Sequence, residues 1–178
     1  MTSILAVHLS LVLAAASQAA ASSKPADGWG PWQFLVGEWE GDGGGKPGQG
    51  SGAFSFRFEL EGKVLVRRNR SDYPASEGRP AVHHEDLMVI YAAAGGKSTR
   101  AIYFDNEGHV INYTAEFSPG QNILTFSSDP SPSAPAFRLT YTKAGKDRVT
   151  IRFEIAPPGK PEALSTYLEG GAHRLHSP

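Results

Sequence analysis

The sequence predicts an all-β protein, an antiparallel up-and-down β-barrel of about ten strands with a short helical turn near its start. From about residue 37 onward, apolar residues alternate with polar ones at a period of two, and no stretch keeps a helical period. The chain has 20 glycines and 13 prolines, and these separate the apolar stretches as turn residues. Strands joined in sequence order by short turns lose their exposed edges most simply by closing into a barrel.

The alternation and the turn residues together place the individual strands. The phenylalanines Phe54, Phe56 and Phe58 alternate with polar residues, which predicts a strand with one buried face. Asn106 and Gly108 indicate a tight hairpin between two later strands. The expected strands are residues 38–42, 54–60, 63–70, 84–92, 99–105, 109–117, 122–127, 137–142, 149–155 and 164–174.

Composition excludes several classes of function. The chain has 17 Lys and Arg against 18 Asp and Glu, a net charge of −1, so we expect no nucleic-acid partner, because phosphate binding needs a clustered basic surface. The absence of cysteine excludes disulfides, thiolate metal sites and thiol nucleophiles. The length and the 40% of hydrophobic residues suit one domain with one core.

The N-terminus has the features of a secretory signal peptide. Residues 4–16 are apolar and residues 19–21 are three alanines that suit signal peptidase, although no Lys or Arg precedes the apolar run. Such a run spans only about 20 Å as a helix, short of the ~30 Å hydrocarbon core of a bilayer, so we expect no stable membrane insertion. We therefore predict a signal peptide at 1–21, a polar lead at 22–31, a barrel domain at 32–176, and export to the periplasm or the medium.

Residues 32–41 resemble the opening of a calycin, a helical turn followed by Gly-x-Trp at the first strand, here Gly37 and Trp39. In lipocalins and their relatives this Trp packs at the closed end of the barrel beneath an Arg from the last strand, a position that Arg174 occupies. The run Phe-x-x-Gly-Glu-Trp-Glu-Gly is most similar to exported bacterial lipocalin-like proteins of unassigned function. Nitrobindin-like haem barrels and fatty-acid-binding barrels are more distant resemblances. The resemblance implies a fold and no established reaction.

Four residues are expected to form a polar group at one mouth of the barrel. His84 begins one expected strand, Tyr103 ends the next, and His109 and Tyr113 belong to the third. They are candidates to bind the polar end of a ligand, with solvated strand ends and turn hydrogen bonds as the structural alternative. Unperturbed histidines would make such binding change between about pH 5.5 and 7.5. Arg68 would meet a ligand carboxylate if its face is inside; otherwise it is a surface charge, as are its neighbouring arginines.

Other motifs favour no specific chemistry. The glycine run at 43–48 matches a dinucleotide-binding spacing, but it includes a proline and precedes a strand, so we interpret it as a hairpin connection. The His and acidic cluster at 83–86 could hold a metal or haem only if His109 or His173 joined it. We expect neither metal nor cofactor, with haem as a minor alternative. No nucleophile elbow is present, so the sequence leaves enzyme activity undecided.

Three hypotheses of function follow. The first is a monomeric or dimeric exported barrel that binds a small, mostly apolar or amphipathic molecule inside. The second is an enzyme on the same barrel, an isomerase or a haem-dependent detoxifier, that uses His84, Tyr103 or His109. The third is a non-catalytic envelope protein with a filled barrel. The content of the barrel interior distinguishes them.

Overall fold

A computed structural model describes residues 28–43, 51–76, 78 and 80–176. The described residues form one short 3-10 helix and ten strands. These are η1 (Gly30–Phe34), β1 (Gly37–Gly41), β2 (Ser51–Glu59), β3 (Val64–Tyr73), β4 (Val82–Ala92), β5 (Thr99–Asp105), β6 (Val110–Phe117), β7 (Ile123–Ser128), β8 (Ala136–Lys143), β9 (Arg148–Ala156) and β10 (Ser165–Arg174). The all-β prediction is confirmed.

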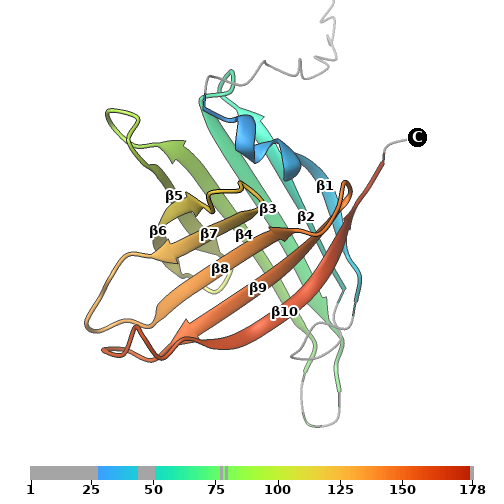
Figure 1. Cartoon of the computed structure of the whole chain (residues 1–178). Helices are drawn as coiled ribbons and strands as arrows, with labels where there is room; N and C mark the ends of the chain where they lie inside the picture. The colour runs from blue at the N-terminus through green and yellow to red at the C-terminus, as the bar shows by residue number, and fades with distance from the viewer. Residues whose placement is uncertain (1–27, 44–50, 77, 79, 177–178) are drawn as a thin grey trace, which may run out of the picture.

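The ten strands close into a barrel (Figure 1). Consecutive strands pair antiparallel, and the ring closes where β1 pairs with β10, with Trp39 opposite Arg174 and Gly41 opposite Ala172. Closure leaves no free edge in the described sheet, so no row of unpaired backbone groups is left to attract another strand. The predicted up-and-down barrel is thus the observed fold.

The strands around the third connection are longer than the sequence predicts. β3 continues to Tyr73 and β4 begins at Val82, although the residues after Arg70 are mostly polar. Ser71 lies opposite His84, and Tyr73 lies opposite Val82. Backbone hydrogen bonds between strands do not depend on side-chain polarity, so this hairpin extends beyond the part that the apolar alternation marks.

One end of the barrel, called here the closed end, is covered by η1. It also carries the turns after β2, β4, β6 and β8. The Trp32 ring packs edge-on against Phe117, with centroids 5.2 Å apart, and Trp29 packs in the same way on Phe58 at 5.5 Å. Figure 1 shows η1 lying across this end of the strands. At the opposite, open end the strands β1, β3, β5, β7 and β9 end.

The structure brings the three Gly-x-Trp signature residues together at the closed end. Trp39 is 1% exposed, and its indole Nε1 donates to the Leu35 carbonyl at 2.8 Å. The Arg174 guanidinium lies 4.3 Å from the centre of the Trp39 ring, and its Nη2 donates to the Phe34 carbonyl at 2.8 Å. Gly37 has φ +124°, and a Cβ there would lie 2.8 Å from Arg174 Nη1. A side chain at this position would therefore displace the arginine.

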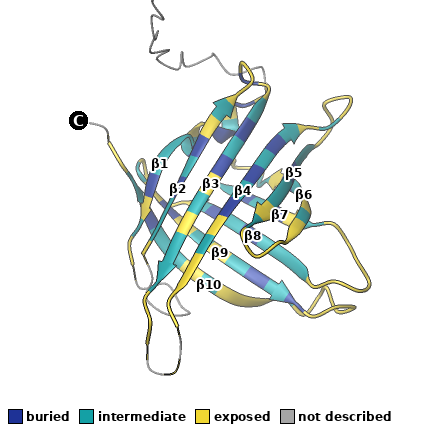
Figure 2. Cartoon of the chain, turned by 180° about the vertical axis from the view of Figure 1, so that it is seen from behind, coloured by how far each residue is buried: buried dark blue, intermediate teal, exposed yellow. Residues whose placement is uncertain are grey.

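The middle of the barrel is filled by aromatic side chains. Phe54 and Phe56 of β2 reach Tyr141 of β8, with ring centroids 5.8 and 5.6 Å apart, and Phe126 of β7 lies 6.4 Å from the same tyrosine. Because β2 and β8 stand on nearly opposite sides of the ring, these contacts cross the interior. Figure 2 shows the buried positions of β3 and β4 alternating in the half nearer η1. The space for a ligand is therefore not in the middle.

Candidate functional site

A buried ion pair lies inside the barrel on β3 and β4. Alternation along these strands turns Arg67 and Asp86 inward together with the core residues Leu65 and Met88. Arg67 Nη1 contacts Asp86 Oδ1, and the two side chains are only 8% and 4% exposed. Asn69 Nδ2 donates to the second Asp86 oxygen at 2.9 Å. Burial alone would lower the pKa of Arg67, but Asp86 together with the nearby Tyr141 and Tyr103 outweighs it and the pKa is raised, so the guanidinium stays charged.

A row of hydrogen bonds continues from this pair toward the open end. His84 Nε2 lies 3.2 Å from the Tyr103 hydroxyl oxygen, and that hydroxyl donates to Asp105 Oδ2 at 3.2 Å. His84 Nδ1 lies 3.0 Å from a carboxylate oxygen of Glu107, and Nε2 lies 3.4 Å from Asp86. The strands that carry these residues run in opposite directions, so the start of β4 and the end of β5 meet at one end.

The same contacts shift the pKa values of the two central groups. Hydrogen bonding to Asp86, against the effect of burial and together with Glu107, raises the pKa of His84 to about 9. Burial, with the nearby charges of Asp86 and Asp105, raises the pKa of Tyr103 far above its usual range. At neutral pH, therefore, His84 is an imidazolium and Tyr103 is a neutral phenol.

His109 and Asp105 shape the β5–β6 turn at the rim of the open end. Asp105 Oδ1 accepts from the backbone N–H groups of Glu107 and His109, at 3.0 and 2.9 Å. Its Oδ2 lies 2.8 Å from His109 Nδ1. Burial would raise the pKa of Asp105, but the hydrogen bonds from His109 outweigh it and lower the pKa. Asp105 thus serves both the turn and the row of hydrogen bonds.

The five residues that the sequence singled out have different positions. His84 and Tyr103 meet inside, and His109 sits at the rim with an exposed ring. Tyr113 lies beneath them in the core, 2% exposed, with its ring edge-on to Tyr103 at 6.5 Å. Arg68 is exposed on the outer face. Ligand contact by any of them stays a prediction.

Arg67, not Arg68, is the arginine inside the barrel. Neither expectation for this strand included an inward Arg67. One placed Arg68 and Arg70 on the inner face, and the other placed all three arginines on the surface. The strand has apolar residues at both parities, Val64, Leu65 and Val66, so alternation alone cannot choose its inner face. Asn69 and the partnership of Arg67 with Asp86 were not predicted, because only the pairing of β3 with β4 brings these residues together. We call six residues the polar wall: Arg67, Asn69, His84, Asp86, Tyr103 and Asp105.

Aromatic side chains form the opposite side of the open end. Phe137 of β8 and Phe153 of β9 are nearly parallel, with ring centroids 6.0 Å apart and an interplanar angle of 5°. Tyr167 of β10 stands edge-on to Phe153 at 6.1 Å and is 55% exposed. Both phenylalanines share the inner face with Leu139 and Tyr141, yet they are only partly buried. We call these three residues the aromatic wall; β8 to β10 stand across the ring from β3 to β5.

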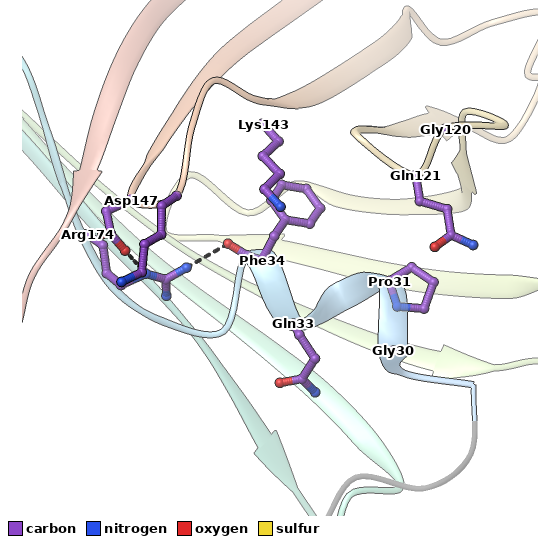
Figure 3. A pocket seen from close by; sticks show the side chains of 10 residues that line it. Gly30, Pro31, Gln33, Phe34, Gly120, Gln121, Lys143, Asp147 and Arg174 are labelled. Carbon is purple, nitrogen blue, oxygen red and sulfur yellow. Dashed lines mark hydrogen bonds and ion pairs between the residues drawn. The ribbon is translucent and has the colours of Figure 1, made fainter.

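Two depressions lie on the surface of the described part of the chain. One, of about 550 Å³, lies at the closed end beside η1 and includes Phe34, Lys143 and Arg174 (Figure 3). There Arg174 already donates to the Phe34 carbonyl and forms an ion pair with Asp147, whose Oδ1 lies 3.2 Å from Arg174 Nε. The other, of about 500 Å³, lies over β1 to β5 and includes Arg68 together with Asn69, Asp86 and Asp105 of the polar wall. Neither includes His84 or Tyr103.

The described residues contain neither a metal-binding cluster nor a membrane-spanning helix. Within the ranges that the structure describes, no group of three or more His, Asp or Glu side chains is placed to hold a metal ion. None of the described helix is long and apolar enough to cross a bilayer. All but the first residue of the glycine run at 43–48, and all of the predicted signal peptide, lie outside the described residues, so these two expectations stay predictions.

Comparison with known proteins identifies a structural neighbour. No protein-family model matches the chain, and no curated protein sequence matches it. Among solved structures, the crystal structure of Rv2717c from M. tuberculosis is similar, with a TM-score of 0.63 and 16% sequence identity. The match covers 86% of this chain and all of that one. At this identity the likeness shows a shared fold, a barrel able to hold a ligand, and nothing about activity.

Proposed function

We propose that this chain is an exported lipocalin-like protein whose barrel binds a small amphipathic molecule at its open end. The observation that carries the proposal is the pairing of the two walls. His84 and Tyr103 are hydrogen-bonded to each other on β4 and β5. Phe137 and Phe153 lie across the ring on β8 and β9, and the side chains on both sides are partly exposed. Few polar groups set among apolar side chains at the mouth of a barrel are typical of a small-molecule site.

The ligand would lie nearer the open end of the barrel than the sequence suggests. The alternation predicts an apolar lining for the ligand, formed by Phe54, Phe56, Phe58, Val149, Ile151 and Phe153, but the rings of Phe54 and Phe56 are packed against Tyr141. Of that lining we retain Phe153, and the apolar part of the ligand would lie against Phe153 and Phe137 while its polar end meets Tyr103. On this proposal the filled middle stabilises the fold, and the open end holds the ligand.

The protonation states disfavour two of the catalytic roles that the enzyme alternative could use. A general base must be unprotonated at the working pH, and His84, with a pKa of about 9, is protonated. The raised pKa of Tyr103 keeps it from acting as a phenolate nucleophile or base. Neither group therefore suits the role of general base or nucleophile at neutral pH.

Binding is tested with an environment-sensitive hydrophobic dye added to the mature protein. We expect the dye fluorescence to rise and saturate as dye is added. The affinity for the dye should fall in Phe153→Ala and change in His84→Gln. His173→Gln is the matched control, because His173 sits on the outer surface with Asp42 at 2.9 Å. The pH range shifts from the sequence expectation: binding should change as His84 loses its proton between about pH 8 and 10. No saturable binding, or equal binding in all variants, would contradict the proposal.

Export is tested separately by N-terminal sequencing of the protein recovered from a cell fraction. The apolar run and the alanines at 19–21 support cleavage after residue 19 or 21. The proposal requires a shortened chain outside the cytoplasm. A cytoplasmic product that retains Met1 would overturn it.

A further inference from the structure

The hydrogen bonds of the polar wall have a fixed direction. Tyr103 has one proton, and its hydroxyl donates that proton to the Asp105 carboxylate, which can only accept. Toward His84 Nε2, 3.2 Å away, the Tyr103 oxygen must therefore be the acceptor. His84 can donate from both ring nitrogens, because Nδ1 also faces a pure acceptor, the Glu107 carboxylate at 3.0 Å. The raised pKa of His84 agrees with this arrangement.

Acceptor capacity remains in this row, and the Tyr103 oxygen supplies part of it. A phenol oxygen has two lone pairs, and the Tyr103 oxygen uses one of them for His84. Both oxygens of Asp105 already accept, one from two backbone N–H groups and the other from Tyr103 and His109. The Asp86 oxygens accept from Arg67 and Asn69. A ligand that reaches the row thus meets an acceptor at Tyr103.

The inward-facing cations at the open end are already neutralised. Arg67 pairs with Asp86 in the barrel interior, and His84 lies between Asp86 and Glu107. A ligand carboxylate would find no unpaired cation among these described groups. It would lie near the carboxylates of Asp86, Asp105 and Glu107, and like charges repel strongly where water is partly excluded.

We propose that the open end selects an uncharged, ring-bearing molecule whose hydroxyl or N–H group donates to the Tyr103 oxygen, and that it rejects the carboxylate of the same skeleton. The inference rests on the proposed function and adds the chemical class of the ligand. The parallel rings of Phe137 and Phe153 give the molecule's ring a flat apolar surface to stack on. The selectivity is opposite to that of a barrel that holds fatty acids by a free arginine.

The test compares three probes on one skeleton: 2-naphthylmethanol, its methyl ether and 2-naphthoate. Affinities are measured at pH 7.5 by displacement of the hydrophobic dye and by calorimetry. The alcohol should bind roughly threefold to tenfold more tightly than the ether, the effect of one neutral hydrogen bond, and at least about tenfold more tightly than the naphthoate. Tyr103→Phe should remove the preference for the alcohol over the ether. Tyr91→Phe, which removes an outward-facing hydroxyl from β4, should keep it.

Each outcome separates this inference from the proposed function. If the dye or any probe binds, but the naphthoate binds as tightly as the alcohol or the ether equals the alcohol, the selectivity is overturned and small-molecule binding stands. If neither the dye nor any probe binds, the proposed function fails and the inference fails with it. The comparison of probes uses the parent protein, so it remains decisive even if Tyr103→Phe does not fold.

Discussion

The substitution Asp86→Asn removes one charge from the buried pair and leaves the other in place. Arg67 stays protonated and only 7% exposed, but it then faces a neutral amide of nearly the same size. Its Nε already has no hydrogen-bond partner among the described residues, so the guanidinium has little else to compensate its charge. An uncompensated buried charge is among the costliest single defects in a protein interior.

We expect this substitution to lower the free energy of unfolding by about 3–5 kcal/mol, the range for breaking one side of a buried ion pair. In a domain of this size each kcal/mol shifts the midpoint of thermal unfolding by about 2–4 °C, so the expected decrease is about 6–20 °C. Urea unfolding followed by tryptophan fluorescence measures the free energy, and calorimetry measures the midpoint.

Two further variants isolate the cause. Glu38→Gln also breaks an arginine–carboxylate pair, with Arg57, but those side chains are 44% and 69% exposed. Its cost should stay under about 1 kcal/mol because water screens the pair. The double variant Arg67→Met with Asp86→Leu should recover most of the stability that Asp86→Asn loses. A cost for Asp86→Asn as small as that of Glu38→Gln would refute the reasoning, since it would mean that Arg67 is solvated.

Three further predictions concern other parts of the barrel. Trp39→Ala should cost about 3–5 kcal/mol as a large-to-small core substitution, and thermal unfolding within a degree or two of the parent would show that Trp39 is not a core residue. Because the pKa of His84 is raised to about 9, its contribution to stability is complete below about pH 6.5 and is lost as the pH rises through 9. Urea unfolding from pH 6 to 10 should show this loss in the parent and a flatter profile in His84→Gln; identical profiles would contradict it. The Tyr141 hydroxyl lies beside Arg67 without a hydrogen-bond partner among the described residues, so Tyr141→Phe should leave stability unchanged or raise it. A loss above about 1 kcal/mol would show that the hydroxyl makes a hydrogen bond.

The sequence predicts the barrel because local signals suffice for it. Strands such as β2 alternate cleanly, and turn residues such as Gly108 separate them, so the number and order of strands can be derived without knowing which strands touch. The proximity of His84 and Tyr103 follows from the same order, because antiparallel neighbours bring the start of one strand to the end of the next.

The rest of the site depends on register, which the sequence does not reveal. The inward position of Arg67 is set by its pairing opposite Met88, and a shift of one residue would have placed Arg68 inside. The aromatic wall involves a bulge near Tyr167, where the pairing with β9 skips from Thr166 to Leu168. No pattern of apolar residues marks such a skip, so this tyrosine was not among the candidates.

The central claim is that a small molecule binds between the polar and the aromatic walls, and NMR mapping tests it most directly. The mature protein, labelled with ¹⁵N and ¹³C, is titrated with 2-naphthylmethanol while the signals of backbone and aromatic groups are followed. The account predicts that the largest changes occur at Tyr103, Phe137 and Phe153, while Phe56 in the filled middle stays unchanged. Changes confined to the closed end around Lys143, or no changes at all, would contradict it.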